Sequence, residues 1–201
     1  MTISEQQIQS TLQHVIDPTT GKDYLSTGSA HNIQIKGNHV SLEIEVGYPA
    51  NSVKHDIQQR IVTALQAIPG IGQINVTVSS KIVPHGVQSG VKLISGIKNI
   101  IAVASGKGGV GKSATAVNLA LALSAEGASV GILDADIYGP SQPQMLGITK
   151  QPESLDGKSM EPVIAHGIQA MSIGLLIDVE TPMVWRGPMV TQALQQLLRD
   201  T

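Results

Sequence analysis

The sequence contains no cysteine. This absence excludes disulfide bonds, and it excludes any metal ion or cluster held by thiolates of these residues. Phenylalanine is also absent, and aromatic residues make up only 2% of the chain. Because 41% of the residues are nonetheless hydrophobic, we expect a packed core built mainly from isoleucine, valine, leucine and alanine.

Long apolar runs and clusters of positive charge are missing as well. No stretch of about 18 apolar residues occurs, so no membrane-spanning helix is expected. The opening "MTISEQQIQS" lacks the basic and apolar regions of a signal peptide. The 13 basic and 15 acidic residues give a net charge of −2, with no cluster of lysine and arginine that would favour nucleic acid. We therefore expect a soluble cytoplasmic protein without membrane or nucleic-acid partners.

A chain of 201 residues is long enough for two small domains. The pattern of residues 1–82 predicts that the first is a small α+β domain. Apolar residues at helical spacing predict helices over residues 5–16, capped by Ser4, and 53–68. Alternating apolar and polar residues predict strands over 31–37, 39–49 and 73–79. The first two strands are expected to form a hairpin that turns at Lys36–Asn38.

Residues 83–97 contain several glycines and no sustained periodicity, and we interpret them as a linker. A second domain is expected over residues 98–201. The run "NIIAVAS", residues 99–105, is typical of a strand buried on both faces of a parallel sheet. A glycine-rich loop, a helix over 112–126 ended by Gly127, and a strand over 128–136 follow.

This order of strand, loop, helix and strand is the opening unit of a P-loop fold. Further along, the pattern predicts a strand over 167–176 and a helix over 188–199 with Pro188 in its first turn. The expected fold class is therefore α/β: a parallel sheet with helices on both faces, incomplete in this sequence, preceded by the small α+β domain.

The glycine-rich loop "SGKGGVGKSA" runs from Ser105 to Ala114 and fits the phosphate-loop pattern G-x-x-x-x-G-K-[ST]. Glycine tolerates the positive φ that lets backbone N–H groups curl around a phosphate, and the following helix directs its positive end at the anion. The residues predicted to bind nucleotide are Gly106, Lys107, Gly108, Gly109, Val110, Gly111, Lys112, Ser113 and Ala114.

Four residues carry the predicted chemistry of ATP hydrolysis. Lys112 is expected to reach the β- and γ-phosphates, and the Ser113 hydroxyl to bind Mg²⁺. Asp134 and Asp136 end the second strand, where ligands of parallel sheets bind. We expect Asp134 to hold Mg²⁺ through water and Asp136 to position the attacking water. Helix capping or turn formation by these aspartates is the alternative.

The string "KGGVGKS" carries an additional lysine, Lys107, and resembles the deviant Walker A loop. Together with "DADIYGPS" and "TPMVWRGPMV", the sequence is similar to the Mrp-type branch of the deviant Walker A ATPases, which are iron–sulfur cluster carriers. Residues 1–82 resemble the MIP18-related domain fused to bacterial members. Asp17, Pro18 and Gly21 loosely match the first loop of that domain.

This resemblance implies several properties that the residues alone do not. It implies a homodimer in which Lys107 reaches the partner subunit's nucleotide and acts as a catalytic residue, supplied in trans like an arginine finger. A solvated loop lysine is the alternative. It also implies a bound iron–sulfur cluster, and apoproteins and assembly factors as partners. The cofactors ATP and Mg²⁺, already predicted from the loop, agree with it. The "WRGP" segment, with Trp185 and Arg186, would lie near the nucleotide or interface.

The sequence departs from this family in what it lacks. Family members continue with a Walker B strand and a C-x-x-C pair that ligates the cluster, and this sequence stops at "LLRDT" before either. We therefore expect it to be the N-terminal part of such a protein, without the cluster ligands. The short run "LLIDV", with Asp178, is not taken as the Walker B strand, because the family places an acidic stretch there.

Three functions are compatible with these observations. The leading one is a carrier that binds and hydrolyses ATP and transfers iron–sulfur clusters to apoproteins. The second is a positioning ATPase of the cell-division or plasmid-partition kind, for which an amphipathic helix or basic patch would be expected. The third is a non-catalytic module that binds proteins through residues 1–80. Whether this chain itself hydrolyses ATP stays open at this point.

Overall fold

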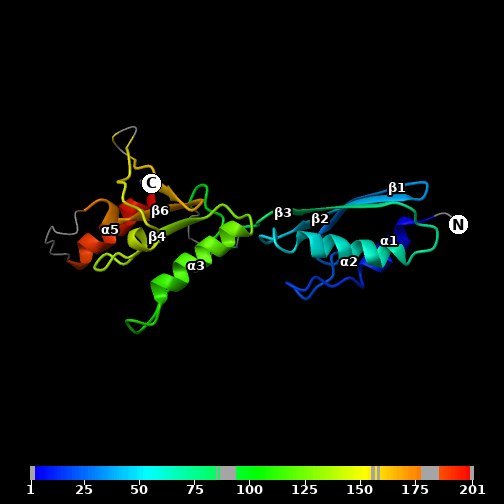
Figure 1. Ribbon diagram of the computed structural model, residues 1–201, viewed down its shortest axis with the longest axis horizontal. Coiled ribbons are helices and arrows are strands. Elements are labelled where there is room, and N and C mark those ends of the chain that lie inside the picture. Colours follow the sequence, from blue (N-terminus) through cyan, green and yellow to red (C-terminus); the bar gives the residue numbers. More distant parts are fainter. Residues whose placement is uncertain are drawn as a thin grey trace. The chain divides into compact units, whose positions relative to one another are not determined.

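The computed structural model describes residues 3–84, 86, 94–154, 157, 159–177 and 186–199. The chain forms two compact units, Met1–His85 and Gly86–Thr201, shown in Figure 1. Their boundary falls inside the segment expected to be a linker, of which residues 85 and 87–93 lie outside the described residues.

The first unit has the predicted element order of helix, strand, strand, helix and strand. In the sheet, β2 lies in the centre, antiparallel to β1 and parallel to β3. The hairpin turn between β1 and β2 lies where it was expected, with Gly37 at φ +65°. The elements are α1 (Glu5–Leu12), β1 (Ala30–Lys36), β2 (His39–Val46), α2 (Lys54–Gln66) and β3 (Ile74–Ser80).

The two ends of α1 differ in how well the sequence predicted them. Ser4 caps the helix as expected, in a capping box in which its side chain and that of Gln7 bond each other's backbone N–H groups. The expected end at Ile16 is wrong, because α1 stops at Leu12. Ile16 instead forms an antiparallel bridge with Asp23 in the loop that follows, and it is 48% exposed. Its helical spacing therefore did not mark it as a residue of α1.

The loop after α1 is organised by the buried carboxylate of Asp17, which is 4% exposed. It accepts hydrogen bonds from the Tyr48 hydroxyl at 2.9 Å, the Thr19 backbone N–H at 2.9 Å and the Thr20 hydroxyl at 3.0 Å. A buried carboxylate is tolerated when donors surround it in this way. This satisfied aspartate therefore fixes the loop against the end of the sheet.

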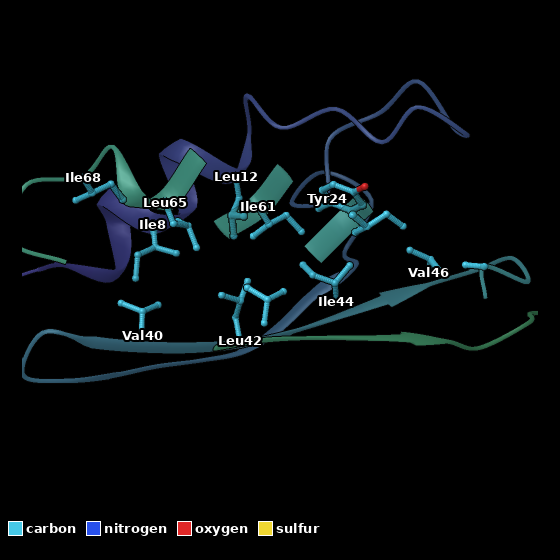
Figure 2. Packing of buried hydrophobic residues seen from close by; sticks show 13 residues of the cluster. Ile8, Leu12, Tyr24, Val40, Leu42, Ile44, Val46, Ile61, Leu65 and Ile68 are labelled. Carbon is cyan, nitrogen blue, oxygen red and sulfur yellow. The ribbon is translucent and has the colours of Figure 1, made fainter. Parts of the chain in front are cut away.

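The core of the first unit lies between the helices and one face of the sheet (Figure 2). Alternate residues of β2, from Val40 to Val46, are buried on this face, whereas the residues between them are not. They face Ile61 and Leu65 of α2 in Figure 2. Both residues are fully buried, as is Ile57 one turn earlier in the same cluster. This small core is aliphatic apart from Tyr24, as the composition predicted.

The second unit contains a three-stranded sheet in the order β4-β6-β5. The pair β4 and β6 is parallel, and β5 forms an antiparallel hairpin with β6. The two long helices are confirmed within one residue at each end, whereas β5 and the short α4 were not predicted. The elements are α3 (Lys112–Ala125), β4 (Gly131–Asp134), α4 (Gln142–Met145), β5 (Val163–Ala165), β6 (Ile168–Ser172), the 3₁₀ helix η1 (Ile173–Leu175) and α5 (Gly187–Arg199).

Helices cover both faces of this sheet, as the sequence predicted. Ile168 and Ala170 of β6 share a cluster with Val117 of α3. Met171, which points to the opposite face because side chains alternate along a strand, shares a second cluster with Leu197 of α5. The sheet therefore separates two small hydrophobic clusters.

The expected strand over residues 99–105 is wrong for this structure. These residues adopt no strand, and Ile100 and Ile101 are 67% and 61% exposed. Among the described residues no other strand pairs with the segment, and a strand needs a neighbour to satisfy its N–H and C=O groups. The apolar composition was recognised, but the pairing partner that would bury it is not present in the described sheet.

Helix α3 shows the same incomplete burial. Its apolar residues are spread around the helix and not confined to one face, which is typical of a helix enclosed on several sides. Only Val117 and Ala120 are buried, however, and Leu119 is 37% exposed. Residues 99–105 and α3 therefore both expose apolar side chains in the second unit.

When the two units are expressed separately, we expect them to differ in association state and in cooperativity of melting. Residues 1–85 have a closed core, so we expect a soluble monomer that melts cooperatively. Residues 96–201 expose apolar side chains and an unpaired apolar segment, so we expect self-association. Sedimentation velocity and circular dichroism would measure both, and a monomeric, cooperatively melting 96–201 fragment would contradict the expectation.

Tyr24 provides a test of the first core. Its side chain is 1% exposed, and its hydroxyl has no hydrogen-bond partner within the described residues. An unpaired buried hydroxyl costs about 1–3 kcal/mol, so Tyr24→Phe should leave the free energy of unfolding unchanged or raise it by about 1 kcal/mol. Tyr48→Phe should lower it, because that hydroxyl donates to Asp17. Urea unfolding of residues 1–85 would measure both changes.

The same substitution should alter the pH dependence of stability. Burial, helped by the negative charge of Asp17, raises the pKa of Tyr24 well above its ordinary value of 10.0. The phenol therefore deprotonates in the unfolded chain first, and its contribution to stability is present below pH 10.0 and lost as the pH rises further. Tyr24→Phe should weaken this alkaline loss, and an unchanged profile would show that Tyr24 does not cause it.

Candidate functional site

The predicted phosphate loop leads directly into α3 with the backbone conformation that its glycines allow. Gly109 and Gly111 have φ of +72° and +84°, which disfavour any side chain with a Cβ. Gly111 is also the N-cap of α3. The Ser105 hydroxyl donates to the Lys107 carbonyl oxygen at 3.1 Å, which closes the start of the loop. Two of the glycines are thus required by conformation.

The other two glycines leave room beside the loop. A Cβ placed on Gly106 or Gly108 would meet no atom within 4 Å. No side chain caps the start of α3, so its first N–H groups have no side-chain acceptor. Open space, free N–H donors and a positive helix end fit an oxyanion such as a phosphate chain.

The Lys112 ammonium group contacts the carboxylate of Asp136, with 3.3 Å between Nζ and Oδ2. The two residues are 24 positions apart, and both were predicted as site residues. Their side chains are 34% and 39% exposed, so this ion pair stabilises the fold by at most about 1 kcal/mol. Such a weak pair can be exchanged readily for a stronger anion.

Asp134 lies in very different surroundings from Asp136, although it ends β4 only two residues before Asp136. It is 5% exposed, and its Oδ2 accepts from the backbone N–H groups of Ser141 and Gln142 at 2.9 and 3.0 Å and from the Ser172 hydroxyl at 3.4 Å. Oδ1 accepts from the Asp136 N–H at 3.1 Å. The turn-forming role that the sequence left open is therefore present. Oδ1 keeps one further acceptor position, because a carboxylate oxygen has two lone pairs.

Gln142, which was not predicted from the sequence, connects this region to the phosphate loop. Its side-chain amide nitrogen donates to the carbonyl oxygen of Ser113, at 3.1 Å, in the first turn of α3. The available signal was Ser141 two residues before Pro143, since serine followed by an early proline is typical of a helix start. That pattern predicts α4 but not the contact that Gln142 makes.

Residues 136–142 lead from the end of β4 into the first residue of α4, and we call them the Asp136–Gln142 loop. Contacts from several elements hold this loop in place. Ile137 is 4% exposed and belongs to the cluster that α5 covers. Pro140 packs so closely on Gly174 that a Cβ on this glycine would lie 3.0 Å from the proline ring. The carboxylate of Asp136 is directed at Lys112 from a loop fixed at both ends.

The remaining predicted residues are not brought into this cluster. Lys107 is exposed and its side chain forms no hydrogen bond or ion pair with the described residues. Val110 is 55% exposed, and Ala114 is also on the surface. Arg186 is exposed, whereas Trp185 and Asp178 lie outside the described residues.

The described residues contain neither a cluster of metal-binding side chains nor a membrane-spanning helix. Among them, no group of three or more histidine, aspartate or glutamate side chains could hold a metal ion. A magnesium ion would therefore need ligands from phosphate and water besides Ser113. In the same part of the chain, no helix has the length and apolarity needed to cross a bilayer.

Two protein families match the chain. A family described as "NUBPL iron-transfer P-loop NTPase" matches residues 96–201. A family described as "Iron-sulfur cluster assembly protein" matches residues 5–78. Each range lies in one of the two compact units. The match to the P-loop NTPase family, over residues 96–201, covers more than half of the chain.

Curated relatives extend the similarity across both units. An "Iron-sulfur cluster carrier protein" of Haemophilus influenzae is 42% identical over 198 residues, which are 98% of this chain and 54% of that protein. One of Escherichia coli K12 is 43% identical over 195 residues, 96% of this chain and 53% of that protein. The chain therefore spans about half the length of the curated relatives it matches. A solved structure, a "Domain of Unknown Function DUF59 from Bacillus anthracis", is 21% identical with a TM-score of 0.34 and covers 37% of this chain and 72% of its own.

The contacts of Asp134 predict a local loss of protection when it is removed. Asp134→Ala would leave the N–H groups of Ser141 and Gln142 without their acceptor, at about 1–3 kcal/mol each. Amide hydrogen exchange at these two positions, measured by NMR, should therefore accelerate by about tenfold or more. Asp136→Ala is the matched control, because Asp136 accepts from Gly139 and not from these residues. Unchanged exchange in Asp134→Ala would contradict the structural role.

Proposed function

The chain belongs to the family of NUBPL iron-transfer P-loop NTPases, and from this premise we propose that residues 106–114 bind ATP with Mg²⁺ and take part in its hydrolysis. The observation that carries the proposal is the ion pair between Lys112 and Asp136, which places the loop lysine beside a carboxylate at the open face of the phosphate loop. The curved, uncapped loop around it supplies N–H donors for the phosphates.

In this proposal ATP takes the place of Asp136 as the partner of Lys112. A triphosphate carries more negative charge than one carboxylate, and the half-exposed ion pair offers little resistance. Lys112 would then contact the β- and γ-phosphates, while the N–H groups at the start of α3 contact the remaining oxygens. The exchange frees the carboxylate of Asp136 at the position where the terminal phosphate lies.

The fit of Mg²⁺ depends on oxygen atoms near the first turn of α3. Ser113 would hold the ion through its hydroxyl, and Asp134 would accept a hydrogen bond from a bound water at the open position of Oδ1. When bound, Mg²⁺ neutralises negative charge on the phosphate oxygens. Both residues are already held in place, Ser113 by Gln142 and Asp134 by its four donors.

Hydrolysis then needs a positioned water and a stabilised leaving group. The freed carboxylate of Asp136 would orient a water whose oxygen bonds to the γ-phosphorus and whose proton passes to a phosphate oxygen, while the bond from phosphorus to the β,γ-bridging oxygen breaks and ADP departs. Lys107, exposed and without a partner among the described residues, would supply a second positive charge to the nucleotide of another subunit in a homodimer.

We further propose that the whole protein carries iron–sulfur clusters to apoproteins, together with assembly factors, in the cytoplasm. The names of the relatives support this function, and they favour it over the positioning ATPase. This chain has no cysteine, so thiolate ligands for a cluster cannot come from its own residues. The first unit, which matches the assembly-protein family, would provide the contact with apoproteins or assembly factors.

Two lysine substitutions separate nucleotide binding from hydrolysis. Lys112→Ala should weaken the binding of a fluorescent ATP analogue by at least about tenfold, because a charged contact to phosphate is lost. Lys107→Ala should leave binding intact but lower ATP turnover by about 1,000-fold, if it acts as a charge supplied in trans. Fluorescence titration and phosphate release would measure the two effects in the full chain.

Lys150→Ala is the control, because Lys150 is exposed and lies outside the loop. Full turnover in Lys107→Ala would refute the role of Lys107. Nucleotide binding without any turnover in the unchanged chain would restrict this chain to binding, and the absence of binding would refute the proposal as a whole.

A further inference from the structure

Two buried side-chain oxygen atoms at the start of α4 have no hydrogen-bond partner among the described residues. They are the hydroxyl oxygen of Ser141 and the side-chain carbonyl oxygen of Gln142. Gln142 is only 5% exposed, so solvent does not reach it freely. Leaving a buried polar atom unpaired costs about 1–3 kcal/mol, and native proteins rarely do so without a ligand or an ordered water.

The position of these atoms is fixed by contacts on both sides. The backbone N–H groups of Ser141 and Gln142 donate to Oδ2 of Asp134, at 2.9 and 3.0 Å. The amide nitrogen of Gln142 donates to the carbonyl oxygen of Ser113, at 3.1 Å, so the unpaired oxygen sits on a side chain anchored to the first turn of α3. Ser141 is the N-cap of α4 and makes no capping bond with its hydroxyl.

The chemistry of these atoms restricts what can satisfy them. A carboxamide oxygen is an acceptor only, and the hydroxyl oxygen of Ser141 also has lone pairs to offer. Oδ1 of Asp134 adds a third acceptor position in the same segment. Two oxygens without a donor, beside a third that can accept one more hydrogen bond, suit bound water molecules. Water in the shell of Mg²⁺ is a strong donor, and this ion usually keeps several of its waters in protein sites.

Resting on the proposed binding of Mg²⁺ with ATP at Ser113, we propose that Ser141 and Gln142 are positioning residues for the hydrated ion. Their unpaired oxygens accept hydrogen bonds from water molecules bound to Mg²⁺, alongside Asp134. They do not contact the nucleotide. Their removal therefore weakens the binding of Mg²⁺ to the nucleotide complex and leaves the binding of metal-free nucleotide as it was.

Ser141→Ala is the sharpest test, because it removes one hydroxyl and keeps the backbone N–H that donates to Asp134. Ser141→Thr keeps a hydroxyl and should retain the function. Gln142→Met removes the second oxygen at similar size, although it also removes the contact with Ser113. The matched controls are Ser129→Ala and Gln144→Met, since both residues are exposed and Gln144 lies on the same α4.

The experiment titrates Mg²⁺ into the full chain with a fluorescent ATP analogue and repeats the nucleotide titration with a chelator present. Ser141→Ala and Gln142→Met should each raise the Mg²⁺ concentration for half-maximal effect by about tenfold, as loss of an outer-shell partner typically does. Nucleotide affinity in the chelator should stay unchanged, and Ser141→Thr and both controls should match the unchanged chain.

Three results would overturn the proposal. An unchanged Mg²⁺ dependence in Ser141→Ala would exclude contact with the hydrated ion, whether or not Gln142→Met folds. Equal weakening with and without Mg²⁺ would assign the oxygens to a structural water instead. Failure of the unchanged chain to bind nucleotide at all would overturn the proposed function itself, and this proposal with it.

Discussion

The carboxylate of Asp134 is the interaction on which the second unit's candidate site depends. A buried carboxylate is stable only when donors surround it, and here the donors come from the Asp136–Gln142 loop and from β6. Satisfying this one charge therefore fixes the path of the loop. That path directs Asp136 at Lys112 and Gln142 at Ser113, which brings the end of β4 to the phosphate loop.

The first unit uses the same device in a different setting. Asp17 is buried after α1 and accepts from the turn that follows it and from Tyr48. There the aspartate holds the loop after α1 in a unit whose core is packed between the helices and one face of the sheet. In the second unit the aspartate sits beside an exposed loop, and residues 99–105 stay unpaired within the described chain. A buried aspartate surrounded by hydrogen-bond donors thus fixes a structural loop in the first unit and the candidate site in the second.

The predictions from sequence succeeded where local periodicity decides the structure. The long helices, the hairpin turn at Gly37 and the strands of the first unit follow from patterns of a few residues. The strand predicted over residues 99–105 was wrong, because a buried strand forms only where a neighbouring strand pairs with it. The short α4 and β5 were missed for a related reason. Elements of three or four residues are stabilised by their contacts and carry little pattern of their own.

The sequence by itself determined the glycine-rich loop with Lys112, which we predict to bind phosphate, and the absence of thiolates, because these are properties of residue type and spacing. It predicted different roles for Asp134 and Asp136, but residue type and spacing could not show that their surroundings differ. Only the tertiary structure did so, by surrounding Asp134 with four donors and leaving Asp136 to Lys112. The contact of Gln142 with Ser113 was likewise decided in three dimensions, because it joins residues 29 positions apart.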